Sequence, residues 1–251
     1  MLKNAHPMPS DMLPSEAMYI VKFNDFIENI VSGYQTLTVS GRGMLGYSLH
    51  TNDISGGDGQ MFIGANLPAR DLTIEYVIDS KTPEQFIKKL DQLTNLLLGK
   101  QFWLYFNDDP MWHYQGTVSS FEAPEKGQLL AKGSFTITCS DPFKYSDNEV
   151  SNGNKPISGQ AKIDEIDFKP NAAVGKFSIT NDYGQSMIVD GTVNGGDTII
   201  IKPHVPSIML NGTYHTEWFG FASDIENFAM TNNIKASVDG SFIIKYRRFR
   251  L

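Results

Sequence analysis

The sequence predicts a mainly β protein of two domains, an amino-terminal β-rich domain that carries one α-helix and a carboxy-terminal β-sandwich. The first observation behind this prediction is length, since 251 residues exceed an ordinary single domain. The second is that apolar and polar residues alternate through much of the chain, as in half-buried strands. The third is a polar stretch at residues 146–160, which predicts a linker between the two domains.

One helix is predicted over residues 82–98. Thr82 is a favourable N-cap, Pro83 suits the first helical position, and Gln85 completes the spacing of a capping box. Gly99 predicts where the helix ends. The apolar residues that recur at helical spacing are Phe86, Leu90, Leu93 and Leu97.

Strands are predicted around this helix in a first domain of residues 18–145. Turn signals at residues 107–110 and 124–127 separate the later strands and indicate an antiparallel meander. The run at residues 102–106 is apolar at every position and predicts a strand buried on both faces. The predicted strands after the hairpin described below are residues 71–79, 102–106, 112–119 and 129–139.

Short β-prone runs separated by Asn- and Gly-rich turns predict a sandwich over residues 161–251. These runs are residues 176–180, 186–193, 198–202, 207–210 and 242–249.

The amino-terminal residues 1–17 contain three prolines and lack the apolar core of a secretory signal, so none is expected. A flexible arm, a vector-derived remnant and a docking tail remain open for this stretch.

Composition limits the function classes. The formal charge of −7 argues against unspecific binding of nucleic acid or of an anionic membrane, because both need a basic surface. Residues 1–150 carry 11 basic and 18 acidic side chains, whereas residues 151–251 carry 10 of each, so the acidic excess lies in the first part. Cys139 has no partner for a disulfide.

A glycine-rich segment, residues 40–70, predicts a long hairpin with its tip at Gly56, Gly57, Asp58 and Gly59. So long a hairpin carries its apolar side chains beyond the core of its own domain, and an isolated hairpin is marginal in water. We therefore expect a neighbouring subunit to cover it. The residues assigned to this inter-subunit belt are Met44, Leu45, Tyr47, Leu49, Gly57, Asp58, Gly59, Met61, Phe62, Ile63 and Arg70.

Several residues suggest chemistry, and for each a structural explanation is favoured. Asp108, Asp109 and His113 resemble a metal or acid–base cluster, but they fit a turn followed by the polar face of a strand. Cys139 lies on the apolar side of a strand, which favours a buried side chain over a nucleophile. Residues 53–59 lack the ligand periodicity of a calcium loop. A phosphate loop requires a helix directly after its glycines, and no helix is predicted after Gly41-Arg42-Gly43. No cofactor, metal or enzymatic activity is expected.

The densest aromatic group admits two interpretations. It consists of Tyr214, His215, Trp218, Phe219 and Phe221. Such side chains are commonly found in cores or interfaces, and they also stack on sugar rings. The basic run at residues 245–250 is either a charge-protected strand or a docking surface for an acidic partner.

The order of these elements resembles the distal tail protein family of siphophages. The first domain runs from "MYIVKFND" through a "GGDG" tip, "ARDLTIEYVI", the capped helix and "FWLYFNDDPMWHYQGTV" to "GSFTITCSDPFKYS". The strings "KFSITN", "GDTIIIK" and "LNG" are similar to the family's galectin-like carboxy-terminal sandwich. The motif residues that carry the resemblance best are Cys139, Ser140, Asp141, Pro142 and Tyr145, followed by Gly57, Gly59 and Arg70.

This resemblance implies a structural hub in the virion, at the tip of the phage tail. The first domain would form a hexameric ring with residues 40–70 as a belt between subunits, and the sandwich would be an attachment platform. The implied partners are the tail tube protein, the tail-associated protein and receptor-binding or baseplate proteins, with assembly in the host bacterial cytoplasm. DNA would cross a central channel without specific binding, and the acidic first part is either the channel wall or an ordinary solvated surface.

Two other functions are weighed against this hub. The first is an adhesion module that binds host-surface carbohydrate through the aromatic group at residues 214–221. The second is a hydrolase of cell-wall glycans with paired carboxylates. No pair of acidic residues stands out for that chemistry.

Overall fold

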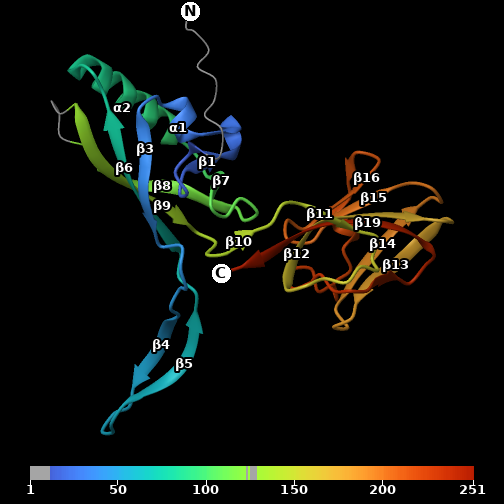
Figure 1. The fold of residues 1–251 in the computed structure, drawn as a ribbon. Helices are drawn as coiled ribbons and strands as arrows, with labels where there is room; N and C mark the ends of the chain where they lie inside the picture. The colour runs from blue at the N-terminus through green and yellow to red at the C-terminus, as the bar shows by residue number, and fades with distance from the viewer. Residues whose placement is uncertain (1–11, 123, 125–128) are drawn as a thin grey trace, which may run out of the picture. The chain divides into compact units, whose positions relative to one another are not determined.

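The computed structural model describes residues 12–122, 124 and 129–251, and the chain divides into two compact units. Unit 1 ends at Lys144, and unit 2 spans Tyr145–Arg250 (Figure 1). Strands dominate both units, which confirms the predicted mainly β class.

Unit 1 is built on one antiparallel sheet. Within the described residues the sheet has seven strands in the order β2-β1-β7-β8-β9-β6-β3. A separate ladder, β4-β5, extends from it. The strands are β1 (Met18–Ile20), β2 (Asp25–Phe26), β3 (Tyr34–Ser40), β4 (Ser48–Asp53), β5 (Gln60–Asn66), β6 (Arg70–Asp79), β7 (Phe102–Phe106), β8 (Tyr114–Glu122) and β9 (Leu130–Cys139).

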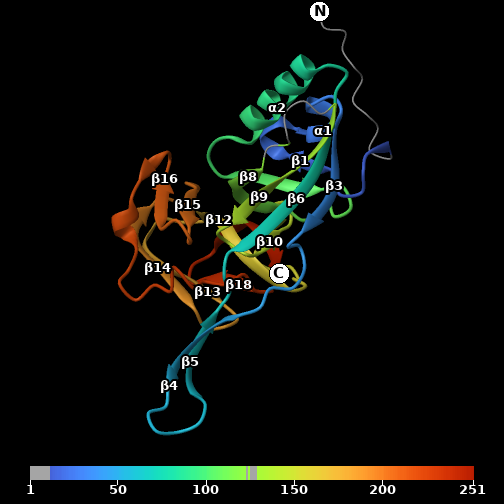
Figure 2. The ribbon, with the colours of Figure 1, turned by 90° about the vertical axis from the view of Figure 1, so that its left-hand side faces the viewer.

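The predicted helix is confirmed as α2 (Pro83–Leu97), and a shorter helix, α1 (Ile27–Ile30), precedes β3. Thr82 Oγ1 accepts a hydrogen bond from the backbone N–H of Gln85 at 3.3 Å, as an N-cap should. The apolar face of α2 packs with the buried side of the sheet into one core (Figure 2).

Alternation along the strands separates the core from the outer face of the sheet. Leu72, Ile74, Tyr76 and Ile78 of β6 are fully buried, and the residues between them point outward. In β7, Trp103 and Tyr105 are only half-buried, so the expectation of a strand buried on both faces was wrong. The outward side of β7 carries stacked aromatics, with Tyr19 and Tyr105 ring centroids 4.4 Å apart.

Unit 2 is a two-sheet sandwich. One sheet has the order β10-β19-β12-β15-β16-β17 with β11 also on β19, the other has the order β14-β13-β18, and both contribute to one apolar core. The strands are β10 (Lys144–Tyr145), β11 (Glu149–Ser151), β12 (Gln160–Pro170), β13 (Val174–Asn181), β14 (Ser186–Val193), β15 (Ile199–Lys202), β16 (Ser207–Leu210), β17 (Thr213–Tyr214), β18 (Ile234–Ala236) and β19 (Gly240–Arg250). Short 3-10 turns include η2 (Val21–Phe23) in unit 1 and η3 (Thr216–Trp218) in unit 2.

The structure differs from the predicted boundaries in three places. The stretch predicted as a linker, residues 146–160, lies in unit 2 and contains β11, which pairs with β19. The predicted amino-terminal arm is packed at its end, because Leu13 and Ala17 are buried in unit 1. Its residues 1–11 lie outside the described residues, as do residues 125–127 of the turn predicted at 124–127. The eleven-residue strand β12 was missed, because a register shift between Ile163 and Glu165 breaks its alternation.

One carboxyl group is buried in unit 1. Glu28 of α1 is 5% exposed, and its Oε1 accepts hydrogen bonds from Thr36 N at 3.1 Å and Thr36 Oγ1 at 2.7 Å. Its Oε2 is buried without a hydrogen-bond partner among the described residues. Loss of hydration on burial raises the pKa of Glu28 above its ordinary value of 4.5, although the hydrogen bonds from Thr36 oppose the shift.

The raised pKa predicts that Glu28 weakens the fold as the pH rises. Because the unfolded chain releases this proton at lower pH than the folded chain, the free energy of unfolding falls from about pH 4.5 upward through the folded pKa. Glu28→Gln removes that loss, so the variant should be stabilised relative to the natural protein at pH 7 and nearly equal to it at pH 4. Urea unfolding at the two pH values measures the difference. A stability difference that does not change with pH would contradict the assignment.

Candidate functional site: an exposed hairpin arm

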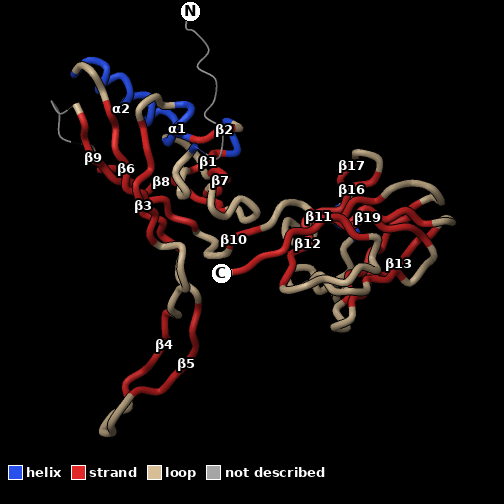
Figure 3. The backbone as a smooth tube through the Cα atoms, viewed as in Figure 1, coloured by secondary structure: helices blue, strands red, loops and turns tan. Residues whose placement is uncertain are grey.

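The arm, residues 41–69, is a hairpin that extends out of the body of unit 1 (Figure 3). The last pair of the body ladder is Ser40 with Thr73, and the first pair of the arm is Ser48 with Asn66. Gly56 and Gly59 at the tip have φ of +76° and +86°, which favour glycine. At about 3.3 Å per residue, the fifteen residues from Gly41 to the tip reach roughly 50 Å.

Neither face of the arm is covered by its own unit. Met61, Phe62 and Ile63 point alternately to the two faces of β5, yet they are 56%, 63% and 58% exposed. The exposed large apolar residues of this fully described segment are Met44, Tyr47, Leu49, Ile54, Met61, Phe62 and Ile63. Leu45 is half-buried, and Ile54 was absent from the residues predicted for the belt.

This exposure is unfavourable in water. Burying one large aliphatic or aromatic side chain stabilises by about 1.5–3 kcal/mol relative to leaving it exposed. A surface that covered all seven side chains would therefore gain on the order of 10 kcal/mol before its costs. The arm is suited to assembly rather than to the stability of a single chain.

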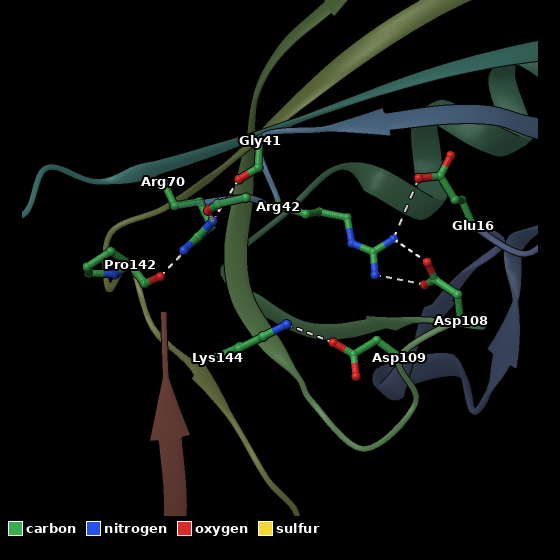
Figure 4. Close-up of polar contacts among 9 residues, drawn as sticks. Glu16, Gly41, Arg42, Arg70, Asp108, Asp109, Pro142 and Lys144 are labelled. Atoms are coloured by element: carbon green, nitrogen blue, oxygen red, sulfur yellow. Dashed lines mark hydrogen bonds and ion pairs between the residues drawn. The ribbon is translucent and has the colours of Figure 1, made fainter. Parts of the chain in front are cut away.

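Arg70 fixes the root of the arm (Figure 4). Its guanidinium donates from Nη1 to the carbonyl oxygens of Gly41 and Gly43 at 2.7 and 2.8 Å, and from Nε to that of Pro142 at 2.8 Å. Arg70 was predicted to belong to the belt between subunits, but it is 0% exposed and lies inside unit 1. Arg70 is placed inside the unit because its planar guanidinium can donate to carbonyl oxygens of two chain segments at once.

Gly41 lets the two strands approach at this root. Its φ is +86°, and a Cβ at this position would lie 1.8 Å from the carbonyl oxygen of Asp71. Any other residue would therefore force the strands apart.

Ion pairs hold the next residues of the arm. Arg42 Nη1 and Nη2 donate to the two carboxylate oxygens of Asp108 at 2.8 Å each, and Glu16 lies 3.6 Å away (Figure 4). Asp109 accepts from Lys144 Nζ at 2.7 Å. The turn interpretation is thus supported, and both carboxylates have a structural role.

Part of the family-like motif lies at the same root. Cys139 is buried and pairs with Arg70 between β9 and β6, and burial raises the pKa of its thiol to about 12. Pro142 supplies a carbonyl to Arg70, and Asp141 Oδ1 accepts from Phe143 N at 3.1 Å. Ser140 is exposed, and Tyr145 is buried in unit 2.

Comparisons with known proteins identify relatives of this chain. The family model described as the phage tail protein RIFT-related domain matches residues 20–139, most of unit 1. The distal tail protein of Bacillus phage SPP1 is 26% identical over 188 residues, covering 69% of this chain and 74% of the relative. The crystal structure of SPP1 Dit (gp 19.1) has a TM-score of 0.78 at 17% identity and covers 94% of this chain and 99% of that one. The chain belongs to the siphophage distal tail protein family.

A second solved structure shows the same fold. A chain of the baseplate of phage P2, in its activated conformation with Ca, has a TM-score of 0.54 at 9% identity, covering 86% of this chain and 91% of that one. As a distal tail protein, the chain is a structural component of the virion tail.

The described residues of this distal tail protein do not support the metal site that the sequence suggested. No group of three or more His, Cys, Asp or Glu side chains that could hold a metal occurs among the described residues. His113 packs edge-on against Tyr105, with ring centroids 5.1 Å apart. In the part of the chain that the structure describes, no helix is long and apolar enough to cross a membrane.

The aromatic group of unit 2 is divided by the structure. The ring of Trp218 stacks on His215 at 4.1 Å, and Gly191 lies so close that an added Cβ would be 2.1 Å from the ring. Much of the ring surface of Trp218 is therefore in contact with the protein itself. Phe219 is half-buried and forms a bridge to Val189, which leaves Tyr214 and Phe221 exposed. This arrangement disfavours stacking of a sugar on Trp218.

The basic run at residues 245–250 is largely neutralised within unit 2. Lys245 pairs with Glu165, and Arg247 forms a two-point contact with Asp164 at 2.7 Å. Arg248 pairs with Glu149. These contacts favour a charge-paired strand over a docking surface for an acidic partner.

Replacing Arg70 tests its role at the root. Arg70→Met removes the donors of three carbonyl groups, and a buried acceptor left without a partner costs about 1–3 kcal/mol, so we expect a loss of roughly 3 kcal/mol or more. Denaturant unfolding of the full chain measures it. Arg70→Lys keeps the charge without the planar fork and should fall between the two proteins. Equal stability of Arg70→Met and the natural chain would show that the root holds without the guanidinium.

Proposed function

We propose that this distal tail protein is the structural hub of the tail tip and assembles into a ring of six copies. The observation that carries the proposal is the arm, whose apolar side chains are exposed on both faces. A second copy of the chain would shelter them, and an arm reaching roughly 50 Å is long enough to cross a domain about 40 Å wide.

The arm favours a ring over a two-fold dimer. An arm that docks on a different surface of its neighbour makes a head-to-tail contact, and such contacts form a ring when the rotation between copies closes and a filament when it does not. The number six follows the family resemblance. Of the relatives, SPP1 Dit is described as a hub of the adsorption apparatus in phages that infect Gram-positive bacteria. We extend that role to this chain.

The outward face of the unit 1 sheet suits a channel wall. Hydroxyl groups and carboxylates bond to each other along it, as in Thr138 Oγ1 to Asp71 Oδ1 at 2.6 Å and Ser134 Oγ to Glu122 Oε2 at 3.0 Å. Glu75 is also exposed here, and Lys132 is the one basic side chain on this face in the described strands β3, β6, β8 and β9. An acidic wall repels phosphates, so DNA would slide through without being bound.

The proposed connections follow from the hub role. The ring would join the tail tube protein to the tail-associated protein, and unit 2 would hold the receptor-binding or baseplate proteins. Assembly would take place in the host bacterial cytoplasm.

The native mass tests the ring directly. Light scattering of the purified chain should give six times 28.0 kDa or a multiple of that mass. A monomer at high concentration would refute the ring.

Shortening the arm tests the contact that carries the proposal. Residues 49–65 are replaced by Asn-Gly, which joins the cross-strand partners Ser48 and Asn66 through a two-residue turn and keeps Gly41 and Gly43 for Arg70. We expect folded monomers that still melt cooperatively by circular dichroism, because the arm adds no core to its own unit, and their melting temperature should fall only by what assembly contributes.

A matched pair of substitutions separates the arm from general surface effects. Phe62→Ser with Ile63→Ser should weaken assembly. Tyr183→Ser with Val205→Ser, at positions that are 74% and 73% exposed in unit 2, should leave assembly unchanged. Equal effects of the two pairs would contradict a specific role for the arm.

A further inference from the structure

A head-to-tail ring needs a surface that receives the arm, and this surface lies on the same chain. The inference below rests on the proposed ring and names the part of the neighbour that the arm tip contacts. The arm itself limits the choice, because the receiving surface has to match its charge and its apolar side chains.

The tip of the arm is acidic. Asp53 and Asp58 lie on either side of the turn, and residues 43–69 include no Lys or Arg. Asp53 Oδ1 accepts from Gln60 Nε2 at 2.9 Å, and neither carboxylate forms an ion pair with a described residue. Ile54, Met61 and Phe62 are exposed beside them. The tip thus presents two negative charges and an apolar surface.

A depression of opposite charge lies at the start of α2. It has a volume of about 600 Å³ and is lined by Lys81, Lys88 and Lys89 together with Asp79. Lys89 Nζ donates to the backbone carbonyl of Asp79 at 2.6 Å, whereas Lys81 and Lys88 are exposed and form no ion pair with a described residue. The three ammonium groups exceed the single carboxylate, and the amino-terminal end of α2 adds partial positive charge. The lysine depression is therefore positive overall.

Apolar side chains border the lysine depression. Ser80 N donates to the carbonyl of Leu129 at 2.7 Å, and Asp79 pairs with Leu130, so both leucines lie at its edge. They are 46% and 64% exposed, and Ile87 is exposed on α2. A positive site with an apolar border is the complement of the tip.

The position of the lysine depression excludes the tip of its own chain. Strand β6 runs from Arg70 at the root of the arm to Asp79 at the depression, about 30 Å away, and the arm points in the opposite direction (Figures 1 and 2). The contacts of Arg70 and Arg42 hold the root in that direction. Only a second copy can bring an arm tip to this site.

We propose that the acidic tip of the arm of one copy docks in the lysine depression of another copy, with Asp53 and Asp58 facing Lys81 and Lys88. The apolar arm would supply most of the affinity, and the charges would set which surface the tip selects.

Charge reversal on each side tests this contact. Asp53→Lys with Asp58→Lys places like charges together, and Lys81→Glu with Lys88→Glu does the same from the other side. Each pair should raise the protein concentration at half-assembly on the order of tenfold or more, because like charges at an interface are strongly unfavourable. The chain with all four substitutions restores opposite charges and should assemble close to the natural protein.

Controls separate the contact from net charge. Lys22→Glu with Lys100→Glu makes the same change of charge elsewhere in unit 1 and should not affect assembly. Mass is measured by light scattering over a concentration series at low ionic strength, and the effects should weaken in 1 M salt.

The outcomes distinguish this inference from the ring itself. The docking site would be overturned, with the ring left in place, if both charge-reversed pairs assembled as well as the natural chain. It would also be overturned if the chain with all four substitutions failed to regain assembly. A natural chain that stays monomeric would overturn the ring. Weaker assembly of each charge-reversed pair, with recovery in the chain that carries all four substitutions, would establish the contact.

Discussion

The buried guanidinium of Arg70 is the interaction on which the rest of this structure depends. It binds carbonyl oxygens of Gly41, Gly43 and Pro142, which belong to the start of the arm and to the exit from β9. A buried charge is costly unless hydrogen bonds compensate it, so the carbonyls and the guanidinium stabilise each other. Where Arg70 sits, the packed sheet stops and the uncovered hairpin starts.

The arm shows why a stable chain can carry an unstable element. Two strands without a third layer have two open faces and bury too little apolar surface to be stable alone. Ion pairs from Arg42 to Asp108 and Glu16 anchor it beyond the sheet. The body thus positions the arm, and the apolar side chains remain available for another subunit.

Charges that resemble sites of chemistry serve structure in this protein. Asp108 and Asp109 bind Arg42 and Lys144, and Cys139 is held neutral by burial beside Arg70. In unit 2, ion pairs along β19 neutralise Lys245, Arg247 and Arg248 with carboxylates of the same unit. Charges without an ion pair among the described residues include those at the arm tip, Asp53 and Asp58, and those at the start of α2, Lys81 and Lys88, which are the surfaces proposed to contact another copy.

The sequence by itself determined the elements whose signals are local. The cap at Thr82, the alternation of β6 and the glycine-rich tip each depend on neighbouring residues, so the helix, the strand and the hairpin were predicted in place. Only the tertiary structure decided what joins distant segments. The bulge in β12 hid a central strand, and the role of Arg70 required Gly41 and Pro142 to meet, 29 and 72 residues away. Every residue carries a backbone carbonyl, so a sequence does not show which carbonyls an arginine binds. An arginine buried against carbonyls therefore cannot be distinguished by sequence from an arginine at an interface.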